Sequence, residues 1–197
     1  MRIVLLALLI GCGSDKAGGG DDTPPPADSP VTPDAPAALT LDCASYCTGI
    51  MSRCTGAVQQ YESMESCVNV CGHFAAGTLG EMTGNTLGCR VYHTEAALTD
   101  DPMVHCEHAG PGGGTQCGAT ICEAFCTVAP TVCPTQWGGN GGQSCANKCP
   151  GVSSVPPYSI NSTGDTIECR LYHLTVATVD PGLHCPHTDD QNSATCN

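Results

Sequence analysis

The chain has little of the material from which ordinary globular cores are built. Aromatic residues make up only 4% of its 197 residues, with one Trp and two Phe. A sequence this poor in large apolar side chains buries little surface per residue, so small modules of this composition need covalent cross-links. The composition therefore argues against a fold held together by hydrophobic burial alone.

Positive charge is equally scarce. Six Lys and Arg residues stand against 19 Asp and Glu residues, which gives a formal net charge of −13. The basic residues are scattered and form no stripe, so a polyanion would be repelled. The composition argues against nucleic acid as a partner, and the acidity is expected to serve solubility and a weak attraction for cations.

Long hydrophobic runs are missing as well. The apolar run 3–10 has eight residues, which is too short to span a bilayer and has the length of a signal-peptide core. It leads into Leu-Ile-Gly-Cys at 9–12, which resembles the bacterial lipobox. The resemblance implies a signal peptide over residues 1–11, cleavage before Cys12, and acylation of the Cys12 sulfur. A plain secretory signal with a coincidental cysteine is the alternative.

The lipobox resemblance also implies a location. Acyl chains on Cys12 would hold the protein at a membrane, and Gly13 at the next position favours the outer membrane by analogy with enteric lipoproteins. Residues 12–38 then form the lipid-anchor cysteine and a disordered linker, because 13–38 carries six Pro and five Asp and cannot bury enough apolar area to become ordered. We therefore expect a bacterial cell-envelope lipoprotein whose membrane partner is reached through Cys12.

Cysteine is the residue that the chain has in excess. There are 17 cysteines, and setting aside Cys12 leaves an even number that can all pair. They fall into two series that match one another at a spacing of 78 to 80 residues. The two series are Cys43, Cys47, Cys54, Cys67, Cys71, Cys89, Cys106, Cys117 and Cys122, Cys126, Cys133, Cys145, Cys149, Cys169, Cys185, Cys196.

Other residues follow the same duplication. The stretch Cys-Arg-Val-Tyr-His at 89–93 matches Cys-Arg-Leu-Tyr-His at 169–173. We interpret the chain as two tandem homologous modules, residues 39–117 and 118–197. The predicted fold class is small, disulfide-rich and mainly α, with short helices and loops after a disordered linker. The module itself resembles no family identified from the sequence.

The cysteine spacing predicts part of the pairing. Two C-x3-C pairs in each module place sulfurs one helical turn apart on one face, and two antiparallel helices of this kind can be cross-linked twice. The predicted disulfides are Cys43–Cys71, Cys47–Cys67, Cys122–Cys149 and Cys126–Cys145. Pairing of these cysteines with Cys54, Cys89, Cys106 or Cys117 remains the alternative.

A further helix is expected in each module. Asn85 and Asp165 are suitable N-cap residues for it, and it should end before the Asp-Pro pairs at 101–102 and 180–181, where Pro suits the first position of a new turn. Arg90 could then pair with Asp101 from the following segment. In the second module Arg170 could pair with Asp180 in the same way.

Six of the seven histidines form matched triples. In each triple, two histidines three residues apart lie on one helical turn, and the third comes from the preceding helix. Imidazole suits zinc and copper, so each triple is a candidate Zn or Cu site. The triples are His93, His105, His108 and His173, His184, His187. The alternative is a structural role, in which these side chains only pack and form hydrogen bonds.

Three functions remain open from the sequence. The first is a non-catalytic binding or structural module at the cell envelope, with an envelope or extracellular ligand that the sequence does not name. The second is a metal-binding lipoprotein that uses the two histidine triples. The third, a secreted enzyme, has no support from motifs, since G-x-S-x-G, H-E-x-x-H and P-loop patterns are missing, and we expect no enzymatic activity.

Overall fold

The computed structural model describes residues 38–139, 143–189 and 195–197. The predicted signal peptide and Cys12 lie outside these residues, as does the linker except for residue 38. Within the described part the chain is mainly helical, and an isolated bridge between Ala75 and Thr86 is its only strand-like pairing. The predicted fold class is confirmed. None of the described helices is long and apolar enough to cross a membrane.

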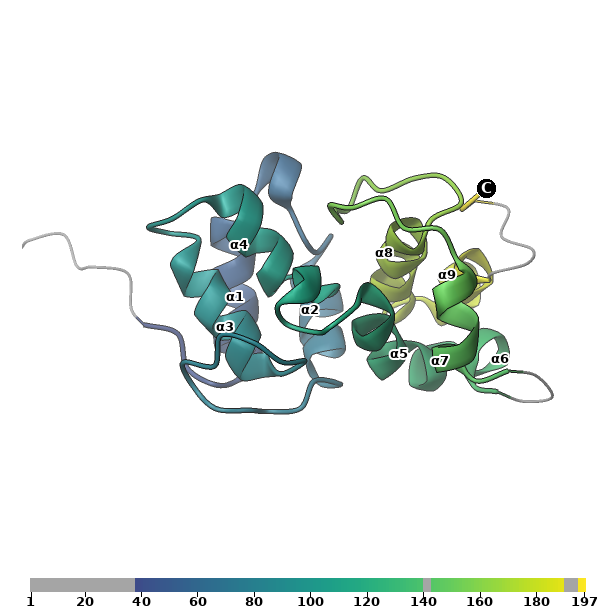
Figure 1. The fold of residues 1–197 in the computed structure, drawn as a ribbon, viewed down its shortest axis with the longest axis horizontal. Helices are drawn as coiled ribbons and strands as arrows, with labels where there is room; N and C mark the ends of the chain where they lie inside the picture. Colours follow the sequence, from purple (N-terminus) through teal and green to yellow (C-terminus); the bar gives the residue numbers. More distant parts are fainter. Residues whose placement is uncertain (1–37, 140–142, 190–194) are drawn as a thin grey trace, which may run out of the picture. The chain divides into compact units, whose positions relative to one another are not determined.

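Helices of related position occur in both repeats along the chain, although the elements do not correspond one to one (Figure 1). The first repeat contains α1 (Cys43–Arg53), η1 (Gly56–Val58), α2 (Met64–Cys71), α3 (Leu87–Ala96), α4 (Pro102–Ala109) and η2 (Gly113–Thr115). The second contains α5 (Ile121–Val132), α6 (Pro134–Trp137), α7 (Cys145–Lys148), η3 (Cys149–Gly151), α8 (Ile167–Ala177), α9 (Pro181–His184) and η4 (Cys185–Thr188).

Eight disulfides hold the two repeats, four in each, with one connectivity. Two bonds join α1 to α2 in the first repeat and α5 to the α7–η3 segment in the second. A third joins the end of the first helix of each repeat to the segment after the Asp-Pro turn, and a fourth joins α3 or α8 to the end of its repeat. The pairs are Cys43–Cys71, Cys47–Cys67, Cys54–Cys106, Cys89–Cys117, Cys122–Cys149, Cys126–Cys145, Cys133–Cys185 and Cys169–Cys196. The four pairs expected from the C-x3-C spacing are among them.

The apolar residues that are present collect around these bonds. In the first repeat the buried side chains include Tyr46, Ile50 and Val91. In the second, Trp137 is buried, and its indole lies edge-on to the ring of Phe125 at 4.8 Å between centroids. The cysteines themselves form much of the core, so sulfur occupies space that aromatic side chains fill in larger domains.

The helices α3 and α8 begin one residue later than the sequence suggested. Their N-caps are Thr86 and Thr166, whose hydroxyls accept hydrogen bonds from the third residue of each helix. The side chains of Asn85 and Asp165, which were expected to cap these helices, interact with arginines instead, so each helix begins one residue later. The Asn85 side chain accepts a hydrogen bond from Arg90 at 2.9 Å, and Asp165 forms a salt bridge with Arg170 at 2.8 Å.

The expected pairing of these arginines with Asp101 and Asp180 is therefore wrong. Both aspartates are N-caps instead, and their carboxylates accept backbone hydrogen bonds at the start of α4 and α9. Arg90 is fully buried, donates to the carbonyl of Gly110, and lies 3.8 Å from the centroid of the Phe74 ring. The guanidinium thereby fixes α3 against the loop that follows α4.

Candidate metal centres

The histidine triple of the first repeat is built by two helices that pack together. His93 lies on α3 and is buried, while His105 and His108 lie one turn apart on α4. Pro102 at the start of α4 and the Cys54–Cys106 disulfide beside His105 set the position of this helix. One ring nitrogen of each histidine lies within 4.8 Å of one ring nitrogen of each of the other two.

Two of these imidazoles face one another through the same type of nitrogen. The Nδ1 atoms of His93 and His105 are 3.0 Å apart. The other nitrogen of each ring already has a hydrogen-bond partner. His93 Nε2 is 3.0 Å from the carbonyl oxygen of Met82, and His105 Nε2 is 3.1 Å from a carboxylate oxygen of Asp100.

These outer partners determine which tautomer each ring adopts in its neutral form. A carbonyl and a carboxylate only accept hydrogen bonds, so Nε2 carries the hydrogen in His93 and in His105. In the neutral form of each ring, Nδ1 then carries a lone pair. Two lone pairs that face each other at 3.0 Å repel unless a proton or a metal cation lies between them. The site is therefore arranged for a shared cation.

A proton is not favoured as that cation, because the surroundings lower the pKa of two of the three histidines. Burial is the main reason that the pKa of His93 is lowered, and repulsion from His105 adds to it. Burial, followed by repulsion from His93 and His105, lowers the pKa of His108 to about 4. The Nδ1 atom of His108 is buried and has no hydrogen-bond partner. Neutral imidazoles with free lone pairs are the form in which histidine binds a metal ion.

The three histidines of the second triple also lie close together, but their outer contacts differ from those of the first triple. His173 comes from α8, His184 is the last residue of α9, and His187 lies in η4. His173 Nδ1 is 3.1 Å from His184 Nδ1 and 3.3 Å from His187 Nδ1. Burial, then repulsion from His187 and His184, lowers the pKa of His173 to about 4.

The spacing of the nitrogens fits a transition-metal ion. A tetrahedral zinc ion bound at about 2.1 Å places its ligand nitrogens about 3.4 Å apart. The Nδ1 distances of 3.0, 3.1 and 3.3 Å in the two triples are close to this value. A hard ion such as Mg²⁺ would instead require oxygen ligands in an octahedral arrangement. The donor set and the spacing therefore favour zinc or copper over Mg²⁺ or Ca²⁺.

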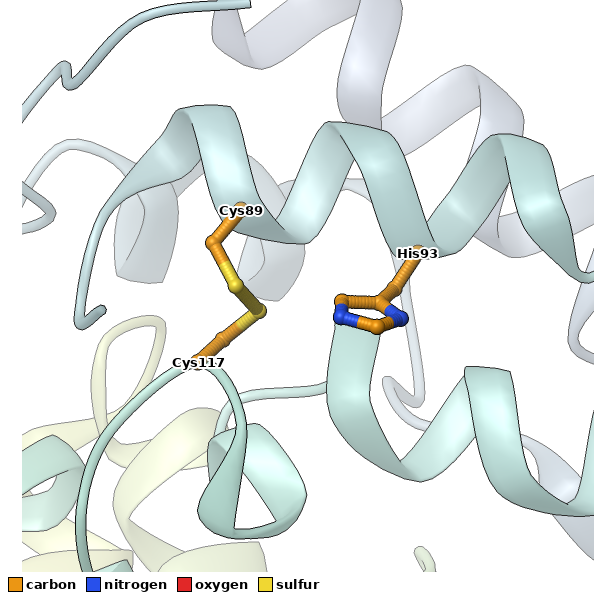
Figure 2. Close-up of side chains that lie close together, drawn as sticks. All are labelled: Cys89, His93 and Cys117. Carbon is orange, nitrogen blue, oxygen red and sulfur yellow. A yellow bond between two sulfur atoms is a disulfide. The ribbon is translucent and has the colours of Figure 1, made fainter. Parts of the chain in front are cut away.

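A disulfide lies beside each triple. Figure 2 shows Cys89, one turn before His93 on α3, bonded to Cys117, with the imidazole next to the bond. The sulfurs and the imidazole are near enough to one another to share an ion, and Cys169, His173 and Cys196 repeat the arrangement. A sulfur in a disulfide is no thiolate and offers only weak donation to a metal. These bonds therefore position the histidines.

The structure brings together all six histidines that the sequence singled out, in the two triples that the repeat predicted. The outer partners were missed. The carbonyl of Met82 has no signature in the sequence, since any residue supplies a carbonyl. Asp100 could have been suspected, because it directly precedes the Asp-Pro turn that leads to His105.

Relatives of the chain include proteins of fungi and of a giant virus. A protein of Acanthamoeba polyphaga mimivirus with the name putative EGF-like domain-containing protein R659 is 33% identical over 146 residues, which are 72% of this chain and 23% of that protein. Bifonsecin B biosynthesis cluster protein A of Aspergillus brasiliensis is 40% identical over 89 residues, 44% of this chain and 30% of the relative. Aurasperone B biosynthesis cluster protein A of Aspergillus niger is 39% identical over 89 residues, which are 44% of this chain and 29% of that protein. No solved structure matches the chain.

These relatives overturn the bacterial interpretation. The lipobox resemblance rests on twelve residues, whereas the similarity to the Aspergillus proteins extends over 89. A short apolar run followed by Gly-Cys carries too little information to outweigh the longer match. The identification as a bacterial lipoprotein and the location in a bacterial cell envelope are wrong. The eight disulfides still indicate an oxidising compartment.

The expectation that the cysteine-rich module resembles no known family is wrong as well. Residues 31–120 match the family described as the BfoA family C-terminal domain. The matched segment contains the whole first repeat, from the Cys43–Cys71 disulfide to the Cys89–Cys117 disulfide. Repeat spacing alone could not reveal this relationship, because it compares the chain only with itself. The first repeat is thus similar to the BfoA family C-terminal domain.

Proposed function

We propose that this chain is a non-catalytic metal-binding protein in which each repeat binds one zinc or copper ion through its three histidines. The observation that carries the proposal is the pair of Nδ1 atoms of His93 and His105, 3.0 Å apart, in rings whose Nε2 atoms both donate outward. A metal ion between the rings would convert repulsion between lone pairs into two coordinate bonds.

The bound ion would act as a further cross-link. It would join α3 to α4 in the first repeat and α8 to the α9–η4 segment in the second, alongside the disulfides that already link these regions to the rest of each repeat. The formal net charge of −13 supports the proposal, since it raises the local concentration of cations around the molecule.

Calorimetric titration of the oxidised full chain with Zn²⁺ and Cu²⁺ tests this function. We expect two sites per chain with sub-micromolar affinity for at least one of the ions, and a rise in the melting temperature with added metal, because an ion that binds only the folded state stabilises it. The double variant His105→Ala with His184→Ala should lose both effects.

The seventh histidine offers a matched control. His73 lies outside both triples, so His73→Ala should bind both ions as the unmodified chain does. Absence of sub-micromolar binding in the unmodified chain, or unchanged binding in the double variant, would contradict the proposed function.

A further inference from the structure

The two histidine triples differ in the groups that lie behind the ligands. In the first repeat the carbonyl of Met82 accepts from His93 Nε2 and the carboxylate of Asp100 accepts from His105 Nε2. Partners of this kind fix the tautomer and the orientation of a metal-binding imidazole and increase the basicity of its other nitrogen. Both rings are thus held with Nδ1 directed into the site before any ion arrives.

Other residues occupy both positions in the second repeat, and only the change at the position of Asp100 removes an acceptor group, because every residue supplies a backbone carbonyl. The duplication aligns Met82 with Ser162 and Asp100 with Val179. Val179 has no hydrogen-bonding side chain and is 46% exposed. Within the described residues, neither His173 nor His184 has a bond that corresponds to those of His93 and His105. In the described part of the chain, the rings of His173 and His184 therefore have no outer partners like those of their counterparts.

Two carboxylates near the second triple have other partners. Asp180 caps α9 by accepting from the backbone nitrogen of Leu183 at 3.1 Å. Glu62 accepts from the hydroxyl of Tyr172 at 2.8 Å and is exposed to solvent. Their charges favour a cation nearby, but they act at a distance and, for Glu62, through solvent that screens the interaction. They do not orient an imidazole as Asp100 does.

We infer that the two metal sites are unequal, that the first repeat binds its ion more tightly, and that Asp100 is the positioning residue responsible for a large part of the difference. This inference rests on the proposed function. Loss of an outer partner typically weakens metal binding by about 10–100-fold. The site of the first repeat should accordingly fill first in a titration.

Single-site variants measure the difference directly. His184→Ala leaves the site of the first repeat, and His105→Ala leaves that of the second. We expect Zn²⁺ to bind the first at least about tenfold more tightly than the second. Equal affinities, or tighter binding at the second site, would overturn the inference while leaving the proposed function intact. Loss of binding in both variants would instead contradict the proposed function.

The role of Asp100 is tested in the His184→Ala background. Asp100→Val copies the second repeat and should weaken Zn²⁺ binding by about tenfold or more. Asp100→Asn should retain most of the affinity, because its amide oxygen still accepts from His105 Nε2. The side chain of Asp100 is 72% exposed, so neither change should unfold the protein. Unchanged affinity in Asp100→Val would overturn the assignment.

Two measurements distinguish positioning of His105 by Asp100 from a general effect of altering the segment between α3 and α4. With Cu²⁺ at the first site, the electron paramagnetic resonance spectrum should change in Asp100→Val and remain close to the original in Asp100→Asn. Val179→Ala in the His105→Ala background is the matched control, and it should leave the affinity of the second site unchanged. A loss in that control as large as in Asp100→Val would attribute the effect to the loop and overturn the inference.

Discussion

At the residue scale, the chemistry is set by where hydrogen atoms lie on the imidazole rings. The first triple is defined by acceptors that hold a hydrogen on Nε2 of His93 and of His105. Both rings thereby have outward donors, which is the arrangement that metal-binding histidines usually adopt. A similar cluster without such acceptors could rearrange its tautomers and satisfy itself with hydrogen bonds between the rings.

The depressed pKa values of His108 and His173 make the metal-free protein sensitive to acid. Both are lowered to about 4, while an unfolded histidine titrates near 6.5. Between these values the unfolded chain binds more protons than the folded chain. The stability that these two rings contribute is therefore fully present above about pH 6.5 and is lost as the pH falls toward 4. We expect the melting temperature of chelator-treated protein to fall across this range.

His108→Gln isolates the contribution of one ring. Glutamine does not titrate, so the variant should show a smaller loss of melting temperature between about pH 6.5 and pH 4 than the unmodified chain. Thermal melts over this range, followed by circular dichroism in the presence of a chelator, provide the measurement. Identical pH profiles for the two proteins would show that His108 does not contribute.

The sequence could predict the ligands but not their support. Duplication selects the six histidines, because a residue kept in both copies at the same spacing stands out even in one sequence. Met82 and Asp100 are aligned with Ser162 and Val179, which are different residues, so comparison of the repeats passes over them. The geometry that makes the first triple a strong candidate became visible only with three-dimensional positions.

At the scale of the elements, the repeats differ where proline occurs in one copy only. The second repeat has Pro186 at the position of Glu107 and Pro150 at the position of Gly72. Proline lacks the backbone N–H that helices use. The helix α4 is accordingly continuous over eight residues, whereas its counterpart is divided into α9 and η4, with four residues each.

Helix starts were predictable only to within one residue. Asn85 and Asp165 have suitable cap chemistry, but so do Thr86 and Thr166. The sequence does not show that the arginines interact with Asn85 and Asp165. The hairpin disulfides were easier to predict, since C-x3-C spacing fixes two sulfurs on one helix face. The bonds of Cys54 and Cys89 span loops that no local pattern encodes.

The cap assignment predicts a measurable cost. Thr86→Ala removes the acceptor for the backbone nitrogen of Cys89 and should lower the free energy of unfolding by about 1 kcal/mol. Urea unfolding of the oxidised protein gives the value. Thr86→Ser keeps the hydroxyl and should cost much less. A serine variant as unstable as the alanine variant would argue against the cap.

At the scale of the whole molecule, disulfides do much of what a hydrophobic core does elsewhere. The bonds Cys54–Cys106 and Cys133–Cys185 close the largest loops, each with a sequence separation of 52 residues. Both attach the segment that carries two of the three histidines to the end of the first helix of its repeat. Folding stability and the geometry of the proposed metal site thus depend on the same covalent bond.

Removal of one such bond tests this coupling. Cys54→Ala with Cys106→Ala should lower the free energy of unfolding by about 2–4 kcal/mol and weaken Zn²⁺ binding at the first site, since His105 adjoins Cys106. Chemical unfolding and titration in the His184→Ala background measure both. The matched pair Cys43→Ala with Cys71→Ala should destabilise the protein with a smaller effect on binding. A reversed order would contradict the coupling.

The connectivity has one further consequence, which concerns proteolysis. All sixteen cysteines of the described residues pair inside their own half of the chain. A single cleavage anywhere between Cys117 and Cys122 would therefore produce two fragments that are each cross-linked by their own disulfides and share no covalent bond. Only noncovalent contacts, such as the hydroxyl of Tyr172 on Glu62, would then keep them associated, and each fragment would leave with one complete histidine triple.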